Sequence, residues 1–158
     1  GPPIADGRPP TITKGVHRVI RIVRLGSPRA TDEGLRIGTV RRPPRGVPRS
    51  AYASEDWYDV WFPNLAPSLA TMKLALQAAT PAQWASFVRK YRAEMATPEN
   101  RHAIALLAAF SHRSNFSVGC YCADESHCHR SILRELLAAS GAALHPPPPS
   151  GGAGGRCD

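Results

Sequence analysis

The chain has 158 residues, of which 42% are hydrophobic and 20% are charged, and its formal net charge is +8. This composition indicates one globular domain with a core of its own and excludes an intrinsically disordered chain. No apolar run reaches the roughly 18 residues of a membrane-spanning helix, and no signal-peptide pattern opens the chain. We therefore expect a soluble, cytoplasmic protein without a membrane partner.

The cysteines argue against a secreted disulfide framework. Of the four, Cys120, Cys122 and Cys128 are clustered within nine residues, and Cys157 stands apart near the end. Reduced thiols or a metal site fit this spacing better than a set of disulfide bonds. Cys157 is expected to be an incidental exposed thiol.

The first elements in chain order are short strands. Residues 1–14 are rich in Pro and Gly and are expected to form a flexible arm before a folded domain over residues 15–144. An apolar centre in residues 16–24 predicts a strand that is covered on both faces. A loop punctuated by glycine and proline follows, and then a second strand over residues 35–40.

Arginine accounts for most of the positive charge, because only three lysines are present. Arginine suits bidentate contact with phosphate, so we expect DNA or another phosphate-bearing partner. The alternative is a solvated, Arg-rich surface. The candidate phosphate-binding residues in the first two loops and strands are Arg24, Arg29, Arg36, Arg42 and Arg45.

An aromatic segment follows the arginine-rich loop. Trp57, Tyr58 and Trp61 are candidates for stacking against a planar ligand such as a base, and Asp56 and Asp59 beside them are candidate catalytic carboxylates. The alternative is that this proline-broken segment is simply packed core or a lid.

Three helices are expected next, and a disordered tail closes the chain. A helix is predicted over residues 68–77, a second after the Thr80–Gln83 capping box, and a third from Thr97-Pro98. The last two carry apolar residues at helical spacing, which predicts a core-facing side. From residue 145 onward the chain has no core-forming residues, and residues 145–158 are expected to be a disordered tail.

Residues 115–137 read as a buried strand, a polar loop and a helix, which is where α/β folds place binding sites. The helix start predicts an anion site, with Ser126, His129 and Arg130 as donors. A zinc site formed by Cys120, Cys122 and Cys128, with His127 or His129 as the fourth ligand, is the alternative. Buried structural cysteines are the third possibility.

Several motifs, taken together, resemble those of the DUF488 family. They are RLGSPR (24–29), DEGLRIG (32–38), RRPPRG (41–46), DVWFPNLAPS (59–68), WASFVRKYRAEM (84–95) and CYCADESHCHRSIL (120–133). The resemblance implies a compact, single α/β domain with a small, mostly parallel sheet flanked by helices. It implies little about function.

The residues themselves lead to three hypotheses about function, and they leave open whether the protein is an enzyme. The first is a nucleic-acid-acting enzyme without a cofactor, such as a DNA glycosylase that hydrolyses the N-glycosidic bond of a modified base. Here arginines hold phosphates, and an aromatic pocket with Asp59 or Asp56 takes the base. The second is a non-catalytic phosphate- or nucleotide-binding module, and the third is a Cys/His metal-binding protein.

Overall fold

A sheet of four parallel strands forms the centre of the protein. The structure is a computed structural model that describes residues 18–147. The strands stand in the order β1-β4-β2-β3, and they are β1 (Ile20–Arg24), β2 (Leu35–Gly38), β3 (Val60–Trp61) and β4 (Phe116–Cys120). Strand β4 pairs with both β1 and β2, so that Val118 stands between Ile22 and Ile37. Every residue of β4 is buried.

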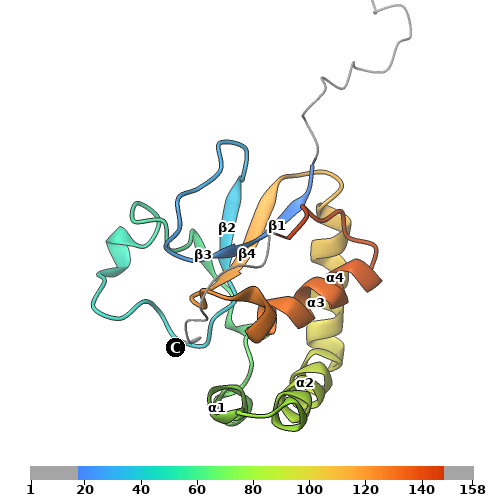
Figure 1. Ribbon diagram of the computed structural model, residues 1–158. Coiled ribbons are helices and arrows are strands. Elements are labelled where there is room, and N and C mark those ends of the chain that lie inside the picture. Colours follow the sequence, from blue (N-terminus) through green and yellow to red (C-terminus); the bar gives the residue numbers. More distant parts are fainter. Residues whose placement is uncertain (1–17, 148–158) are drawn as a thin grey trace, which may run out of the picture.

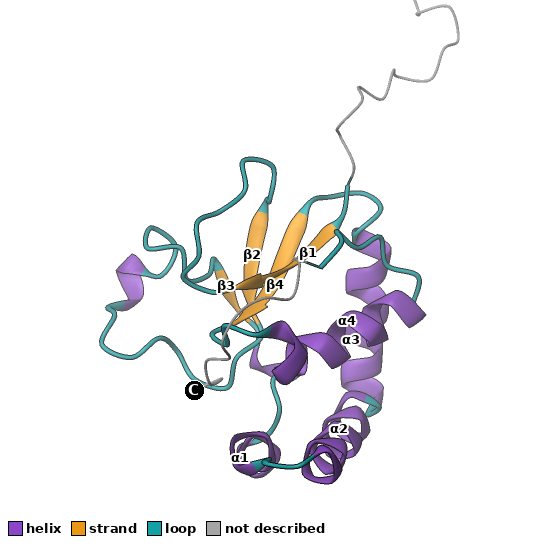
Figure 2. Cartoon of the chain, viewed as in Figure 1, coloured by secondary structure: helices purple, strands orange, loops and turns teal. Residues whose placement is uncertain are grey.

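The helices lie to one side of this sheet (Figures 1 and 2). Three of them separate β3 from β4 and the fourth follows β4. They are α1 (Leu69–Gln77), α2 (Pro81–Met95), α3 (Pro98–Phe110) and α4 (His129–Ala139), and the short 3-10 helices are η1 (Arg49–Ala51), η2 (Pro63–Leu65) and η3 (Glu125–His127). Helix α2 begins with the expected capping box between Thr80 and Gln83, which satisfies backbone N–H groups that a helix start leaves without a partner.

The two faces of the sheet are covered in different ways. On the helical side, Phe116 and Val118 pack with Phe87, Tyr91 and Leu133 in one hydrophobic cluster. The opposite face is covered by loops. The hydroxyl of Ser117 donates to Glu33 there, the ring of Tyr58 lies over the glycine of β2, and a methyl group of Leu25 lies over the glycine of β4. The α/β prediction is confirmed, with helices on one face and loops on the other.

The predicted boundaries shift slightly at the strands. Strand β1 begins at Ile20 and β2 ends at Gly38, so each is shorter than its apolar run. The predicted arm at residues 1–14 lies outside the described residues, as do Cys157 and most of the predicted tail. At the start of that tail, the backbone N–H of His145 donates to the carbonyl of Ile20. None of the helices within residues 18–147 has the length and apolar character that crossing a membrane requires.

Two glycines with positive φ allow a stability test of the loop packing. Alanine at Gly34 (φ 77°) would place its Cβ 2.0 Å from the carbonyl oxygen of Asn115, whereas alanine at Gly46 (φ 72°) would meet nothing within 4 Å. We expect Gly46→Ala to cost about 1–2 kcal/mol of backbone strain. Gly34→Ala should cost about 1–3 kcal/mol more, because the loop must move away from Asn115. Urea unfolding of both variants measures the difference, and equal losses would contradict the close packing at Gly34.

Candidate functional site

The candidate site lies at the carboxyl end of the two central strands. Cys120 is the last residue of β4, and Thr39 directly follows β2. The strands are parallel and in register, with Gly38 opposite Gly119, so both ends reach the same edge of the sheet. The chain then returns through η3 to Cys128, the N-cap residue of α4. This edge is the usual place for ligands in open α/β sheets.

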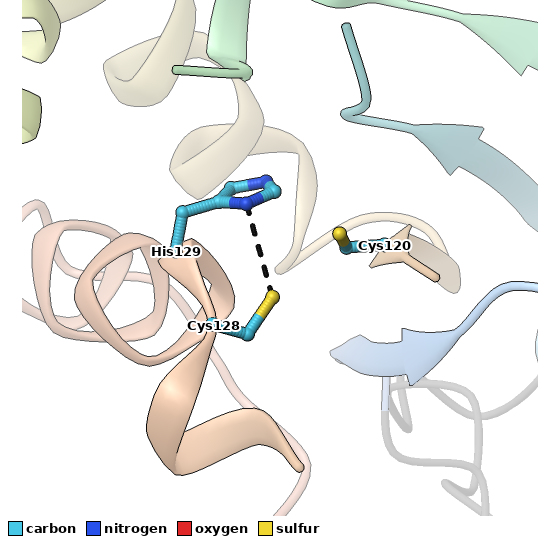
Figure 3. Close-up of side chains that lie close together, drawn as sticks. All are labelled: Cys120, Cys128 and His129. Atoms are coloured by element: carbon cyan, nitrogen blue, oxygen red, sulfur yellow. Dashed lines mark hydrogen bonds between the residues drawn. The ribbon is translucent and has the colours of Figure 1, made fainter. Parts of the chain in front are cut away.

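Three side chains converge at this edge, as Figure 3 shows. The ligand atoms of Cys120, Cys128 and His129 all lie within 4.8 Å of one another, and the three residues are buried. The sulfur of Cys128 is 3.8 Å from Nδ1 of His129. The cluster therefore joins the end of a strand to the start of a helix.

A backbone carbonyl fixes the orientation of the His129 ring. Nε2 of His129 lies 2.8 Å from the carbonyl oxygen of Thr39. Since a carbonyl only accepts hydrogen bonds, Nε2 carries the proton and donates it. Nδ1 is thereby the ring nitrogen that faces the sulfur of Cys128. Such a carbonyl contact is the usual way in which a protein sets the tautomer of a functional histidine.

The pKa values of the two cysteine thiols in the cluster are shifted in opposite directions. Burial raises the pKa of the Cys128 thiol, but the hydrogen bond with Cys120 and the charges of His129 and Arg130 outweigh burial, so its pKa lies well below the ordinary value. The hydrogen bond with Cys128 and burial both raise the pKa of Cys120. Of the two thiols, that of Cys128 is therefore the one that ionises more readily.

Arg130 and Ser126 do not form the outward-facing anion site that the sequence suggested. Arg130 is buried and donates from Nη2 to the carbonyl of Cys122 at 2.7 Å. Its Nε has no hydrogen-bond partner among residues 18–147. The exposed hydroxyl of Ser126 donates to Asp124, which also accepts from the Ser126 backbone N–H at the start of η3. Arg130 thus supplies buried positive charge beside the cysteines.

A small cavity at the cluster lies beside a wide groove. The cavity, of about 40 Å³, is lined by all three cluster residues together with apolar side chains such as Met72 and Phe87. The groove, of about 730 Å³, is lined by arginines, prolines and one tryptophan. Arg42 and Tyr121 line both spaces. A ligand in the groove would therefore lie next to the mouth of the cavity.

The arginines predicted to bind phosphate divide into two groups. Arg24, Arg42 and Arg45 line the groove. Within the described part of the chain, neither Arg42 nor Arg45 has a carboxylate partner within salt-bridge distance, and Arg24 donates only to the backbone carbonyl of Tyr121. Arg29 lies outside this groove, held in ion pairs, and Arg36 is fully buried. The first group thus lines a groove that a ligand could enter, whereas the second is engaged in contacts within the protein.

Asp56 and Asp59 hold Arg29. Asp59 accepts from both terminal nitrogens of Arg29, at 2.7 and 3.2 Å, and from the backbone N–H of Arg36 at 2.8 Å. Asp56 accepts from Nε of Arg29 at 3.2 Å. Burial raises the pKa of Asp59, but the contacts with Arg29 and Arg36 outweigh it and lower the pKa below its ordinary value. A carboxylate bound in this way is a weak base, which favours a structural role over proton abstraction.

The three predicted stacking residues do not share one pocket. Trp57 lines the groove with the arginines, where its ring lies edge-on to Tyr121. Tyr58 and Trp61 line a separate hollow with Asp59. The Trp61 indole N–H donates to the carbonyl of Val40. Only Trp57 therefore lies in the groove with the arginines.

The comparisons with known proteins identify the family. Residues 20–141 match DUF488-N3a, described as the active DUF488-N3 subclade. The chain belongs to the DUF488 family. No curated protein and no solved structure matches it. The matched region includes every strand and the residues of the cluster, so the site lies within the DUF488 domain.

Sequence reasoning missed two residues of this site. Thr39 orients His129 through its backbone carbonyl, which leaves no signature in the side chain. Tyr121 lies between the cavity and the groove and donates its hydroxyl hydrogen bond to the carbonyl of Arg42. Its position beside Cys120 at a strand end was the available signal. Of the two histidines that the metal alternative left open, the structure brings His129 to the cysteines, whereas His127 only lines the same cavity.

Replacing Asp59 tests its structural role. We expect Asp59→Asn to lower the free energy of unfolding by about 1–3 kcal/mol, because the variant cannot form charged hydrogen bonds with Arg29. The matched control is Asp32→Asn, whose exposed pair with Arg21 should contribute about 0–1 kcal/mol. Urea unfolding measures both.

The pH dependence of the same difference gives an independent check. Because folding lowers the pKa of Asp59, its ionised form stabilises the protein above the unfolded-state pKa, and this contribution disappears as the pH falls through the folded-state pKa. The stability difference between the wild type and Asp59→Asn should therefore shrink from about pH 6 to about pH 3. A difference that stays constant over this range would contradict the ion pair.

Proposed function

We propose that this protein is an enzyme that acts on a nucleic acid and hydrolyses the N-glycosidic bond of a base. The observation that carries the proposal is that the arginine-lined groove and the cavity of the buried Cys120–Cys128–His129 cluster share Arg42 and Tyr121 as walls. Arginines that suit phosphates thus lie beside the cavity that holds the reactive side chains.

The charge of the groove supports a phosphate backbone as its ligand. Arg42 and Arg45 present guanidinium groups that no carboxylate among the described residues neutralises within salt-bridge distance, and the chain as a whole carries a formal charge of +8. Guanidinium groups bind phosphate in a bidentate manner. The size and open form of the groove suit an extended strand rather than a single small anion.

Trp57 supports a base as the second part of the ligand. Its ring lines the groove beside the arginines, and its indole N–H is buried without a hydrogen-bond partner among residues 18–147. A base that leaves its stack can lie against such a ring. We infer that the bond between sugar and base then lies near Arg42 and Tyr121, which line both the groove and the cavity.

The cluster supplies groups for the reaction. In the hydrolysis, water adds to the sugar carbon C1′ as the C1′–N bond breaks, one water proton is accepted by the site, and the base leaves with a proton. His129 Nδ1 and the Cys128 sulfur are the acid–base groups that line the cavity. The description of the subclade as active is in keeping with an enzyme.

Nucleic-acid binding is tested by removing groove arginines. We expect Arg42→Ala/Arg45→Ala to weaken binding to single-stranded and duplex DNA and to reduce the slope of log affinity against log salt by about 1 for each phosphate that is no longer bound. Arg89→Ala on the exposed surface of α2, paired with Lys90→Ala, removes the same charge elsewhere and should change the slope much less. Fluorescence anisotropy across a salt series measures both. Identical slopes in the two double variants would contradict a phosphate site in the groove.

Catalysis is tested with a panel of DNA substrates that carry modified bases, with release of free base as the readout. We expect Cys128→Ser to reduce the rate by about 100-fold or more while DNA affinity stays close to that of the wild type. Asp59→Asn should keep most of the rate per folded molecule. Full activity of Cys128→Ser would remove the cluster from the reaction. Arginine-dependent binding without release of any base would instead indicate the non-catalytic binding module.

A further inference from the structure

The donor set of the buried cluster is that of a zinc site. Two cysteine sulfurs and one imidazole nitrogen lie within 4.8 Å of one another, and all three residues are at most 4% exposed. In a tetrahedral zinc site, neighbouring sulfurs are about 3.8 Å apart, as follows from Zn–S bonds of about 2.3 Å. The Cys128 sulfur and His129 Nδ1 are already 3.8 Å apart. Since no two of the three ligand atoms are more than 4.8 Å apart, they need to approach one another by only about 1 Å to bind the same zinc ion.

We propose that Cys120, Cys128 and His129 bind one zinc ion, with the fourth coordination position facing the small cavity. This set is smaller than the one that sequence spacing suggested, because Cys122 is not among the converging residues, and of the two candidate histidines it contains His129. Soft thiolates with one imidazole favour zinc over the hard cations magnesium and calcium.

The surroundings of His129 support a role as a ligand. Nε2 donates to the carbonyl of Thr39 at 2.8 Å, which leaves Nδ1 as the nitrogen that faces the sulfurs. Metal-binding histidines commonly make this contact through the nitrogen that does not bind the metal. By contrast, the side chain of His127 is 73% exposed and makes an ion pair with Asp124. The ring of His129 is therefore held ready to bind, whereas that of His127 faces solvent.

The cavity and the buried charge indicate what the fourth ligand would be. All three residues line the cavity, together with Arg41, Arg42 and Tyr121. Two thiolates neutralise the charge of a zinc ion, so the buried Arg130 guanidinium leaves the site with net positive charge. An anionic ligand such as hydroxide suits this position. Three protein ligands with one open position characterise catalytic rather than structural zinc sites.

This site would deepen the proposed function. With zinc bound, the Cys128 sulfur and His129 Nδ1 would be its ligands instead of acid–base groups, and the water on the zinc, whose pKa falls to about 7, would supply the nucleophile that the hydrolysis needs. Only this catalytic role rests on the proposed function. The binding of the metal stands on the geometry of the three residues and is measured separately.

The metal content of the full chain tests the proposal. The protein is produced without an affinity tag and purified without chelators, and its zinc, iron and copper are measured by mass spectrometry. We expect one zinc per chain. Replacing zinc with cobalt(II) should produce a thiolate-to-cobalt charge-transfer band and the intense visible bands of tetrahedral coordination. Removal of zinc by a chelator should lower the melting temperature of the wild type.

Four variants identify the ligands, with circular dichroism as the check on folding. Cys120→Ser, Cys128→Ser and His129→Gln should each weaken zinc binding by more than the roughly 10–100-fold that loss of an outer-shell partner causes. His127→Gln is the matched control and should retain full zinc. If a variant fails to fold, the metal content and cobalt spectrum of the wild type still decide.

Three outcomes would overturn the assignment. They are a folded wild-type protein that takes up no zinc on titration, iron or copper in place of zinc, and loss of zinc in His127→Gln with retention in His129→Gln. The base-release assay is scored independently. Zinc binding without base release would leave the metal site standing and contradict the proposed function. Base release that persists after zinc is removed would leave the proposed function standing and contradict the catalytic role of the zinc.

Discussion

The buried guanidinium of Arg36 is the group on which the non-helical half of the structure depends. It donates to both carboxylate oxygens of Glu33, at 2.7 and 3.0 Å, and to the carbonyls of Ser27 and Asp56. Glu33 also accepts the hydroxyl hydrogen bond of Ser117 on β4. This network holds two loops against the face of the sheet that no helix covers. Its loss would be costly, because removal of one partner from a buried ion pair costs about 3–5 kcal/mol.

The groove is a consequence of that arrangement. The loop after β1 and the segment before β3 are joined by Arg36 and by the pairing of Arg29 with Asp56 and Asp59. Arg29 and Arg36 are engaged in these contacts. The arginines that line the groove are Arg24, Arg42 and Arg45. The structure thus separates arginines that stabilise the loops from arginines that are available to a ligand. Net charge alone makes no such distinction.

The site itself depends on the parallel register of β2 and β4. This register places Thr39 and Cys120 at the same edge, where the N-terminus of α4 brings Cys128 and His129 against them. Each contact is short in space but joins residues far apart in the chain, such as Thr39 and His129. A parallel sheet makes this possible, because its crossover connections bring the ends of non-consecutive strands to one edge.

Local signals in the sequence were sufficient for the fold class and for several elements. The capping box at Thr80, the buried strand ending at Cys120 and the helix that follows it were all predicted, because hydrogen bonds and side-chain periodicity within a few residues determine them. The same reasoning located the region of the candidate site. It did not determine which face of a turn or strand each side chain would occupy.

The tertiary structure alone decided the partners of the individual side chains. Trp57 and Tyr58 are neighbours in sequence yet line different hollows. His129 was selected over His127 for the cluster because the helix turns it toward Thr39 and the sheet. The sequence by itself determined an α/β domain with a cysteine-rich strand–loop–helix unit, since these features are local. Packing across long chain separations decided which cysteines and which histidine meet, because only the assembled sheet brings the ends of β2 and β4 to the start of α4.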